Sequence, residues 1–100
     1  MLLKFKVYEL VKTVPYGKVT TYKEIAKALN VKCYRVIGQA LKQNKDLINI
    51  PCYKVVHANG NVGGYVLGKK EKVKLLKKDN IEVVGDKIVN FEKVLFKFVK

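Results

Sequence analysis

The apolar residues of this chain come in short groups that lysine interrupts almost everywhere, and this pattern limits the fold more than any other feature. No apolar run approaches the roughly 18 residues that a membrane-spanning helix needs. The length of 100 residues is close to that of one typical domain. The sequence therefore predicts a single domain over residues 1–100, built from short elements around one core, with no contact with a membrane.

The pair Pro51-Cys52 is the strongest local constraint, and it stands directly before the strand-forming run Lys54-Val55-Val56-His57. Proline fixes its own backbone and restricts the residue before it, so Cys52 should be presented from a stiff turn. Such a placement suits a nucleophile. It also suits an ordinary buried thiol, because free cysteine packs as a small hydrophobic residue. The turn by itself leaves both interpretations open.

The formal net charge of +13 is spread over both halves of the chain. A nucleic acid is a natural partner for such a surface, although a lysine-rich surface also serves solubility or reflects a lysine-biased proteome. Arg35 is the only arginine. Where lysine is the usual cation, an arginine indicates a use for the planar guanidinium.

Helical periodicity predicts helices over residues 3–14, 22–29, 33–43 and 69–78. Thr20 or Thr21 should cap the second of these, with Glu24 completing a capping box. The second and third helices, joined by a tight turn, form a helix-turn-helix pattern. Gly38 lies inside the third helix, where glycine costs about 1 kcal/mol relative to alanine. It therefore marks either a close-packing point or a place where a nucleic-acid backbone comes near.

The remaining segments predict short extended elements. Residues 47–50 should be extended, residues 55–57 and 62–65 should form a hairpin, and residues 81–84 and 87–89 a second hairpin. Residues 91–100 should form a last short strand or helix. The expected fold class is α+β and mainly helical.

The cysteines and the N-terminus predict a reducing compartment. Two distant cysteines do not make a disulfide framework, and the first residues lack the features of a signal peptide. We expect a cytoplasmic protein, associated with the nucleoid in a prokaryote or nuclear in a eukaryote. Because the chain has neither metal-ligand spacing nor a glycine-rich phosphate loop, we expect no metal and no cofactor.

Five motifs in a fixed order carry a family resemblance. They are Pro15-Tyr16-Gly17-Lys18-Val19-Thr20-Thr21-Tyr22, Arg35-Val36-Ile37-Gly38-Gln39-Ala40-Leu41, Asn44, Ile50-Pro51-Cys52-Tyr53-Lys54-Val55-Val56 and Gly60-Asn61-Val62-Gly63-Gly64-Tyr65. Together they resemble the C-terminal DNA-binding and active-site domain of O6-alkylguanine-DNA alkyltransferases, over about residues 5 to 83. The resemblance implies a winged helix-turn-helix that binds the minor groove and flips the damaged base into a pocket. It also implies an irreversible, single-turnover transfer of a methyl or larger alkyl group from guanine O6 to cysteine, without a cofactor.

The resemblance also implies individual roles. Cys52 is the nucleophile, Arg35 fills the gap left in the base stack, Tyr22 helps to rotate the nucleotide, and Asn44 braces the turn near the active site. Lys72 belongs to the catalytic side of the pocket. The other implied DNA contacts are Tyr34, Gly38 and Lys42, and the implied pocket residues are Leu41, Pro51, Val55, Gly64 and Tyr65.

The active-site run departs from the family pattern at one position. Tyr53 stands where the family has a proton-relaying histidine, and Asp79 stands at the position of the supporting glutamate, which makes it a possible relay. A tyrosine, with a pKa of about 10, is a poor base. We expect Lys54 and the general positive charge to favour the thiolate, and transfer to be slower than in a histidine-bearing relative. His57 is either a substitute base facing the pocket or a surface residue.

Two other functions compete with alkyl transfer. The family commonly carries an N-terminal domain, which we expect to be absent here. Alkyltransferase-like proteins, which sense alkylated DNA without repairing it, also lack that domain, but they have another residue in place of the cysteine. A plain winged-helix regulator is the third possibility. In the first two cases the partner is double-stranded DNA containing O6-alkylguanine, bound by a monomer.

Overall fold

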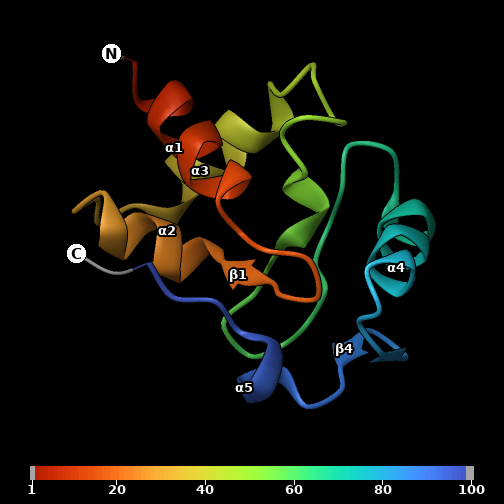
Figure 1. The fold of residues 1–100 in the computed structure, drawn as a ribbon. Coiled ribbons are helices and arrows are strands. Elements are labelled where there is room, and N and C mark those ends of the chain that lie inside the picture. Colours follow the sequence, from red (N-terminus) through yellow and green to blue (C-terminus); the bar gives the residue numbers. More distant parts are fainter. Residues whose placement is uncertain (1, 99–100) are drawn as a thin grey trace.

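The structure is a computed structural model that describes residues 2–98, in which short helices are interspersed with two-residue strands (Figure 1). Three helices come first, then a 3-10 helix and the fourth and fifth helices. In order, the elements are α1 Leu3–Lys12, β1 Thr20–Thr21, α2 Tyr22–Ala28, α3 Tyr34–Lys42, η1 Cys52–Lys54, β2 Val55–Val56, α4 Lys69–Lys78, β3 Val83–Val84, β4 Lys87–Ile88 and α5 Phe91–Val94.

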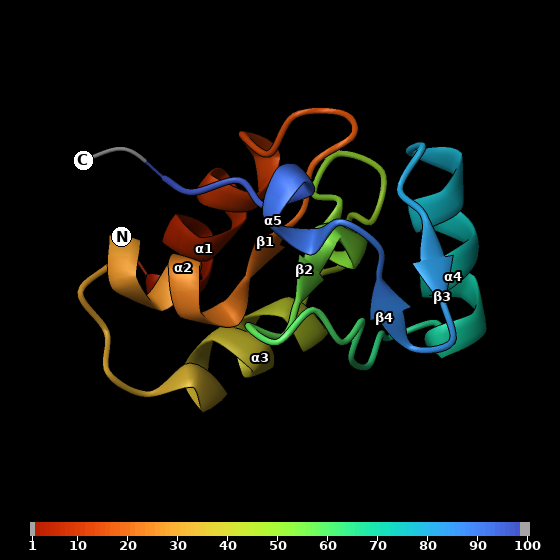
Figure 2. The same ribbon diagram turned by 90° about the horizontal axis from the view of Figure 1, so that it is seen from below.

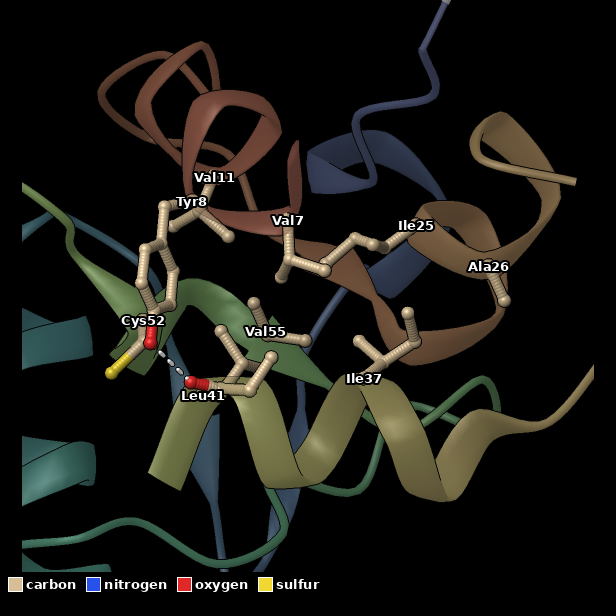
Figure 3. Packing of buried hydrophobic residues seen from close by; sticks show 10 residues of the cluster. Val7, Tyr8, Val11, Ile25, Ala26, Ile37, Leu41, Cys52 and Val55 are labelled. Carbon is tan, nitrogen blue, oxygen red and sulfur yellow. Dashed lines mark hydrogen bonds between the residues drawn. The ribbon is translucent and has the colours of Figure 1, made fainter. Parts of the chain in front are cut away.

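Helices α1, α2 and α3 pack together around the first cluster of buried side chains (Figure 3). The hydroxyl group of Tyr8 in α1 donates a hydrogen bond of 2.6 Å to the carbonyl oxygen of Ala40 in α3. This bond satisfies the one polar group that Tyr8 brings into the interior. The cluster consists of Val7, Tyr8, Val11, Ile25, Ala26, Ile37, Ala40, Leu41, Cys52 and Val55.

Strands β1 and β2 pair in parallel, with Thr20 opposite Val55 and Thr21 opposite Val56. The segment after α5 lies on the other side of β1. There, the backbone nitrogen of Val19 donates to the carbonyl oxygen of Val94 at 2.8 Å, and that of Phe96 donates to the carbonyl oxygen of Val19 at 2.7 Å. The strand that precedes α2 is thus held from both sides.

A second cluster of buried residues lies between α4, the β3–β4 hairpin and the strands. In Figure 2, α4 and β3 lie together at one end of the molecule, whereas α1, α2 and α3 occupy the other. The expectation of one core is therefore wrong, because the β1–β2 layer separates two clusters. The second contains Val19, Val56, Val62, Leu76, Ile81, Val83 and Ile88.

The predicted helices are confirmed, with ends shifted by one or two residues. Thr21 caps α2 as expected, since its hydroxyl oxygen accepts a hydrogen bond from the backbone nitrogen of Glu24 at 2.9 Å. Asn30 and Asn80 follow α2 and α4 with φ values of 57° and 61°. Asparagine tolerates this left-handed conformation, which ends a helix. The hairpin of β3 and β4 is also confirmed.

Two predictions about extended segments are wrong: that residues 47–50 are extended, and that residues 55–57 pair with residues 62–65. Residues 47–50 form a turn, because the side chain of Asp46 accepts a hydrogen bond from the backbone nitrogen of Asn49 at 3.1 Å. Residues 55–57 and 62–65 do not pair as a hairpin. Strand β2 pairs with β1, and the backbone nitrogen of Val62 donates to the carbonyl oxygen of Asp86 at 2.8 Å. The part of residues 91–100 that is described is a helix followed by extended chain, and residues 99–100 lie outside the described range.

The fold class is α+β and mainly helical, as the sequence predicts, with α2 and α3 forming the helix-turn-helix and β3 and β4 the hairpin. Within residues 2–98, no helix is long and apolar enough to cross a membrane.

Replacing Thr21 tests the cap of α2. Thr21→Val keeps the shape and the preference for a strand but removes the hydroxyl group that accepts from Glu24. We expect the free energy of unfolding to fall by about 1 kcal/mol, measured by urea denaturation. Thr21→Ser keeps the acceptor and is the matched control. Equal losses in the two variants would contradict the capping function of the hydroxyl group.

Candidate functional site

The turn at Pro51 presents Cys52 as the sequence predicts. Pro51 has φ −77° and ψ 70°, the values of an inverse γ-turn, and the backbone nitrogen of Cys52 donates to the carbonyl oxygen of Ile50 at 2.8 Å. Cys52 then begins η1. Its residue is only 6% exposed, but Figure 3 shows its sulfur at the edge of the first cluster, pointing away from the cluster centre.

Cys52 lines a pocket of about 790 Å³ between α3, the Pro51-Cys52 turn and the segment after Gly63. Helix α3 supplies one wall, and residues 64–66 supply another. All the lining residues except His57 and Val66 belong to the site that the sequence predicts. They are Tyr22, Tyr34, Arg35, Gly38, Leu41, Lys42, Cys52, His57, Gly64, Tyr65 and Val66.

The thiol of Cys52 is subject to opposing influences. Burial raises its pKa, because the thiolate loses solvation. A hydrogen bond from the side chain of Asn44 and the positive charge of Lys72 both lower this pKa, and burial has the larger effect. A hydrogen bond from the backbone of Cys52 itself lowers this pKa further, by a smaller amount. The net result is a thiol whose pKa lies above its ordinary value.

Asn44 joins the end of α3 to the Cys52 turn. Its amide nitrogen donates to the carbonyl oxygen of Ile50 at 2.9 Å, and its side-chain oxygen accepts from the backbone nitrogen of Asp46 at the same distance. The residue is 6% exposed. Its geometry is that of a brace between two segments of the site, and its function in the site stays a prediction.

Lys72 is buried in α4 without a carboxylate partner among the described ion pairs. Its ammonium group donates to the carbonyl oxygen of Val55 at 2.7 Å and to that of Gly64 at 3.0 Å. Burial lowers the pKa of Lys72 to about 8, and the negative charge of Cys52 opposes this shift. Lys72 therefore ties β2 to the wall of the pocket and acts electrostatically on the thiol.

Lys54 does not have the function that the sequence analysis gives it. It is 5% exposed, and its ammonium group forms an ion pair of 3.1 Å with Asp79 and hydrogen bonds with the carbonyl oxygens of Val14 and Pro15 at 3.3 and 3.2 Å. Its charge is thus neutralised by a buried carboxylate. The lysine that acts on the Cys52 thiol is Lys72.

Tyr53 and Asp79 are joined by a hydrogen bond of 3.3 Å from the hydroxyl group to a carboxylate oxygen. Tyr53 packs against the second cluster, next to Asp79, whose carboxylate also accepts from the backbone nitrogen of Gly17 at 3.1 Å. Burial, then the charge of Asp79, raises the pKa of Tyr53 to about 12. A phenol with this pKa is a still poorer base than an ordinary tyrosine. Proton relay through Tyr53 and Asp79 stays a prediction, and their contacts are those of a structural connection.

Pro51 and Val55, which the family resemblance places in the pocket, are not among its lining residues. Pro51 shapes the turn, and Val55 has a fully buried side chain in the first cluster. Of the two, Val55 reaches the site through its main chain, because its carbonyl oxygen accepts a hydrogen bond from Lys72.

The structure distinguishes between the two interpretations of Gly38, a close-packing point and a place where a nucleic-acid backbone comes near. A Cβ atom added to Gly38 would meet no described heavy atom within 4 Å, so the glycine does not permit close packing within the protein. Its neighbours Tyr34, Arg35 and Lys42 are exposed on the same wall of the pocket. The open face of α3 is available to a partner that approaches the helix backbone.

His57 and Val66 are the two lining residues that the predicted site does not contain. The sequence allows His57 to be either a pocket base or a surface residue, and the structure places it both at the pocket and exposed. Its position depends on the parallel pairing of β1 with β2, which has no sequence signal. Val66 follows Tyr65 directly, so it could have been found by extending the predicted wall by one residue. Within residues 2–98, no cluster of three or more His, Cys, Asp or Glu side chains is arranged to hold a metal ion.

Comparison with known proteins gives one family. Residues 3–81 match the family described as 6-O-methylguanine DNA methyltransferase, DNA binding domain. A bifunctional methyltransferase/endonuclease of Picrophilus torridus is 46% identical over 82 residues, which are 81% of this chain and 28% of that protein. The chain spans between 28% and 52% of the length of the first curated relatives that it matches.

Solved structures agree with this result. The structure of S. pombe Atl1 in complex with damaged DNA containing O6-carboxymethylguanine has a TM-score of 0.83 and 28% identity, covering 94% of both chains. The O6-methylguanine-DNA methyltransferase of Pyrococcus kodakaraensis has a TM-score of 0.73 and 40% identity. That match covers 81% of this chain and 47% of the other.

The reactivity of Cys52 toward iodoacetamide tests the electrostatics of the site. In a Cys33→Ser background, we expect the alkylation rate to rise with pH and to reach its midpoint above that of a free cysteine, because burial raises the pKa of Cys52. Lys72→Met removes the cation that lowers this pKa, so the midpoint should move to still higher pH. The exposed Lys70→Met is the control. An unchanged midpoint in Lys72→Met would contradict the electrostatic function of Lys72.

Proposed function

The chain belongs to the 6-O-methylguanine DNA methyltransferase family through the family's DNA-binding domain, and on this premise we propose that it repairs alkylated DNA by accepting the alkyl group on Cys52. The observation that carries the proposal is the position of Cys52 in a pocket whose opposite wall is the exposed face of α3. One groove thus combines a thiol nucleophile with a basic helix that nucleic acid can reach. The transfer is irreversible and uses each protein molecule once.

The chemistry requires only the thiolate and the substrate. The sulfur atom of Cys52 attacks the alkyl carbon, a carbon–sulfur bond forms, and the bond between that carbon and guanine O6 breaks. The electron pair of the broken bond stays on the base, which takes up a proton and becomes ordinary guanine. The thioether that results is stable in water, so the protein is consumed.

Lys72 supports the thiolate in place of the histidine of the family pattern. Its ammonium group lies buried in the site, bound to two carbonyl oxygens, and its charge lowers the pKa of the Cys52 thiol. With a pKa of about 8, Lys72 is mostly protonated near neutral pH and acts on the thiol through its positive charge. A buried charge acts strongly because little water screens it. This supports activity at a reduced rate in a protein with Tyr53 after its cysteine.

The damaged base must leave the DNA duplex to reach Cys52, at a cost of a few kcal/mol. Arg35 is exposed at the mouth of the pocket, and its planar guanidinium group is suited to occupy the vacant place in the stack. Tyr22, which lines the same pocket, assists rotation of the nucleotide. Tyr34 and Lys42 contact the phosphates or sugars on either side.

The positive surface supplies binding that does not depend on sequence. A net charge of +13 favours phosphate contacts and release of counterions. A protein that surveys any DNA for rare lesions requires this kind of contact. We propose double-stranded DNA containing O6-alkylguanine as the partner, bound by a monomer.

Lesion sensing without repair is the second candidate, and one observation favours it. The TM-score is 0.83 with S. pombe Atl1 and 0.73 with the methyltransferase of Pyrococcus kodakaraensis. The thiol at position 52 supports transfer over sensing. The two functions differ in a single measurable product, the alkylated cysteine.

Intact mass spectrometry tests the proposal. After incubation with an oligonucleotide duplex containing O6-methylguanine, we expect the protein to gain the mass of one methyl group, mapped to Cys52 by peptide analysis. Cys52→Ser should gain nothing, and Cys33→Ser should react like the original protein because Cys33 is exposed outside the pocket. Selective binding of the lesion with an unchanged mass would support sensing instead.

Replacing Gly38 by alanine separates stability from DNA binding. Because a Cβ atom at Gly38 meets only open space and alanine is the better helix former, Gly38→Ala should raise the free energy of unfolding by up to about 1 kcal/mol. It should nevertheless weaken binding to duplex DNA, measured by fluorescence anisotropy, because the new methyl group stands between α3 and the DNA backbone.

Gln39→Ala, an exposed substitution on the same helix, serves as the comparison for general effects on α3. Equal DNA affinity in Gly38→Ala and in the original protein would contradict a close approach of DNA to this helix.

A further inference from the structure

The parallel pairing of β1 with β2 brings Tyr22 and His57 together. Thr21 is opposite Val56, so the next residue of each strand, Tyr22 on one and His57 on the other, emerges at the same end of the pair. The two rings lie with centroids 5.2 Å apart and planes at 42°, a distance within the range of aromatic contacts. Both rings line the pocket that holds Cys52.

The His57 ring also lies close to Gly63. A Cβ atom added at Gly63 would lie 2.8 Å from Nε2 and 2.9 Å from Cδ2 of His57, and Gly63 has φ +72°. Glycine is therefore required at position 63 for two reasons, the positive φ and the close imidazole. The ring thus contacts the ring of Tyr22 and lies close to the backbone of Gly63, although the residue as a whole is exposed.

Polar interactions do not account for this position. Within the described part of the chain, the imidazole of His57 takes part in none of the side-chain hydrogen bonds or ion pairs. Its contacts are the ring of Tyr22 and the backbone of Gly63. The imidazole of His57 thus makes contacts through the flat shape of its ring and not through hydrogen bonds.

Tyr22 and Cys52 line the same pocket. Burial raises the pKa of the Tyr22 hydroxyl group, and the negative charge of Cys52 raises it further. The phenol ring therefore contacts the imidazole of His57 and shares the pocket with the thiol. Tyr22 also packs against the first cluster, so loss of the imidazole would remove one of the contacts that hold its ring.

We propose that His57 is a positioning residue for Tyr22: its ring fixes the Tyr22 side chain at the mouth of the pocket, so that rotation of a nucleotide out of the duplex depends on the flat ring of His57. This inference rests on the proposed function for its effect on transfer. The support that His57 gives to the Tyr22 ring does not require DNA.

The test compares His57→Ala, which removes the ring, with His57→Phe, which keeps a flat ring but has no ionisable group. Single-turnover methyl transfer is measured with O6-methylguanine in duplex and in single-stranded oligonucleotides. We expect His57→Ala to be about three- to tenfold slower on the duplex, in line with the energy of an aromatic contact. The rate on the single strand should change less, because that base needs no extraction from a paired duplex. His57→Phe should stay within about twofold of the original protein on both substrates.

Val84→Ala, an exposed substitution in the β3–β4 hairpin outside the pocket, is the matched control, and thermal melting checks that all variants fold. A duplex rate in His57→Ala equal to that of the original protein would overturn the proposal. So would equal losses in His57→Ala and His57→Phe, because the charge or a nitrogen atom of the imidazole would then be the feature that matters.

Two readouts separate this proposal from the function on which it rests. In the free protein, the NMR signals of the Tyr22 ring should shift in His57→Ala and lose the signs of a fixed orientation, with little change in His57→Phe. Fluorescence of 2-aminopurine placed beside the lesion reports extrusion of the base even where no methyl group moves. A protein that never becomes methylated would refute the transfer function. Unchanged Tyr22 signals in His57→Ala would refute the positioning function.

Discussion

The pairing of β1 with β2 is the constraint on which the site depends. Two residues on each side form this ladder, yet it connects the helix-turn-helix to the segment that carries Cys52. Tyr22 begins α2 where β1 ends, and η1 with Cys52 comes directly before β2. The segment around Val94 and Phe96 holds the outer side of β1. Disturbing this ladder would move the nucleophile, Tyr22 and His57 together.

Lys54 and Lys72 are both buried, but their surroundings give them different functions. Lys54 is neutralised by Asp79 and by main-chain carbonyl oxygens, and with Tyr53 it connects the Cys52 segment to the end of α4. Lys72 is bound by carbonyl oxygens alone, so its charge remains available to the thiol. Burying an ammonium group without a carboxylate is costly. A stabilised thiolate within the same site offsets part of that cost, which gives the proposed function a physical reason for the lysine.

The comparisons identify the family of the chain, and the pocket bears on which function it has. The family match covers residues 3–81 and gives the chain a DNA-binding domain, whereas the choice between repair and sensing depends on the groups around position 52. The thiol, the Asn44 brace and Lys72 support transfer, and the likeness of the fold to Atl1 supports sensing. Repair and sensing therefore differ in whether the sulfur atom of Cys52 takes up the alkyl group, and not in the fold.

The sequence by itself determined the helices, the Thr21 cap of α2, the stiff Pro51-Cys52 turn and most of the residues that line the pocket, because these follow from local periodicity, fixed proline geometry and recognisable motifs. Only the tertiary structure decided which strand β2 pairs with, and hence that His57 meets Tyr22. It also decided which of two lysines faces the thiol, and that Tyr53 turns toward Asp79. A two-residue parallel ladder joins segments far apart in the chain, and the direction of a lysine side chain depends on which acceptors surround it. Neither leaves a periodic or local signal in the sequence.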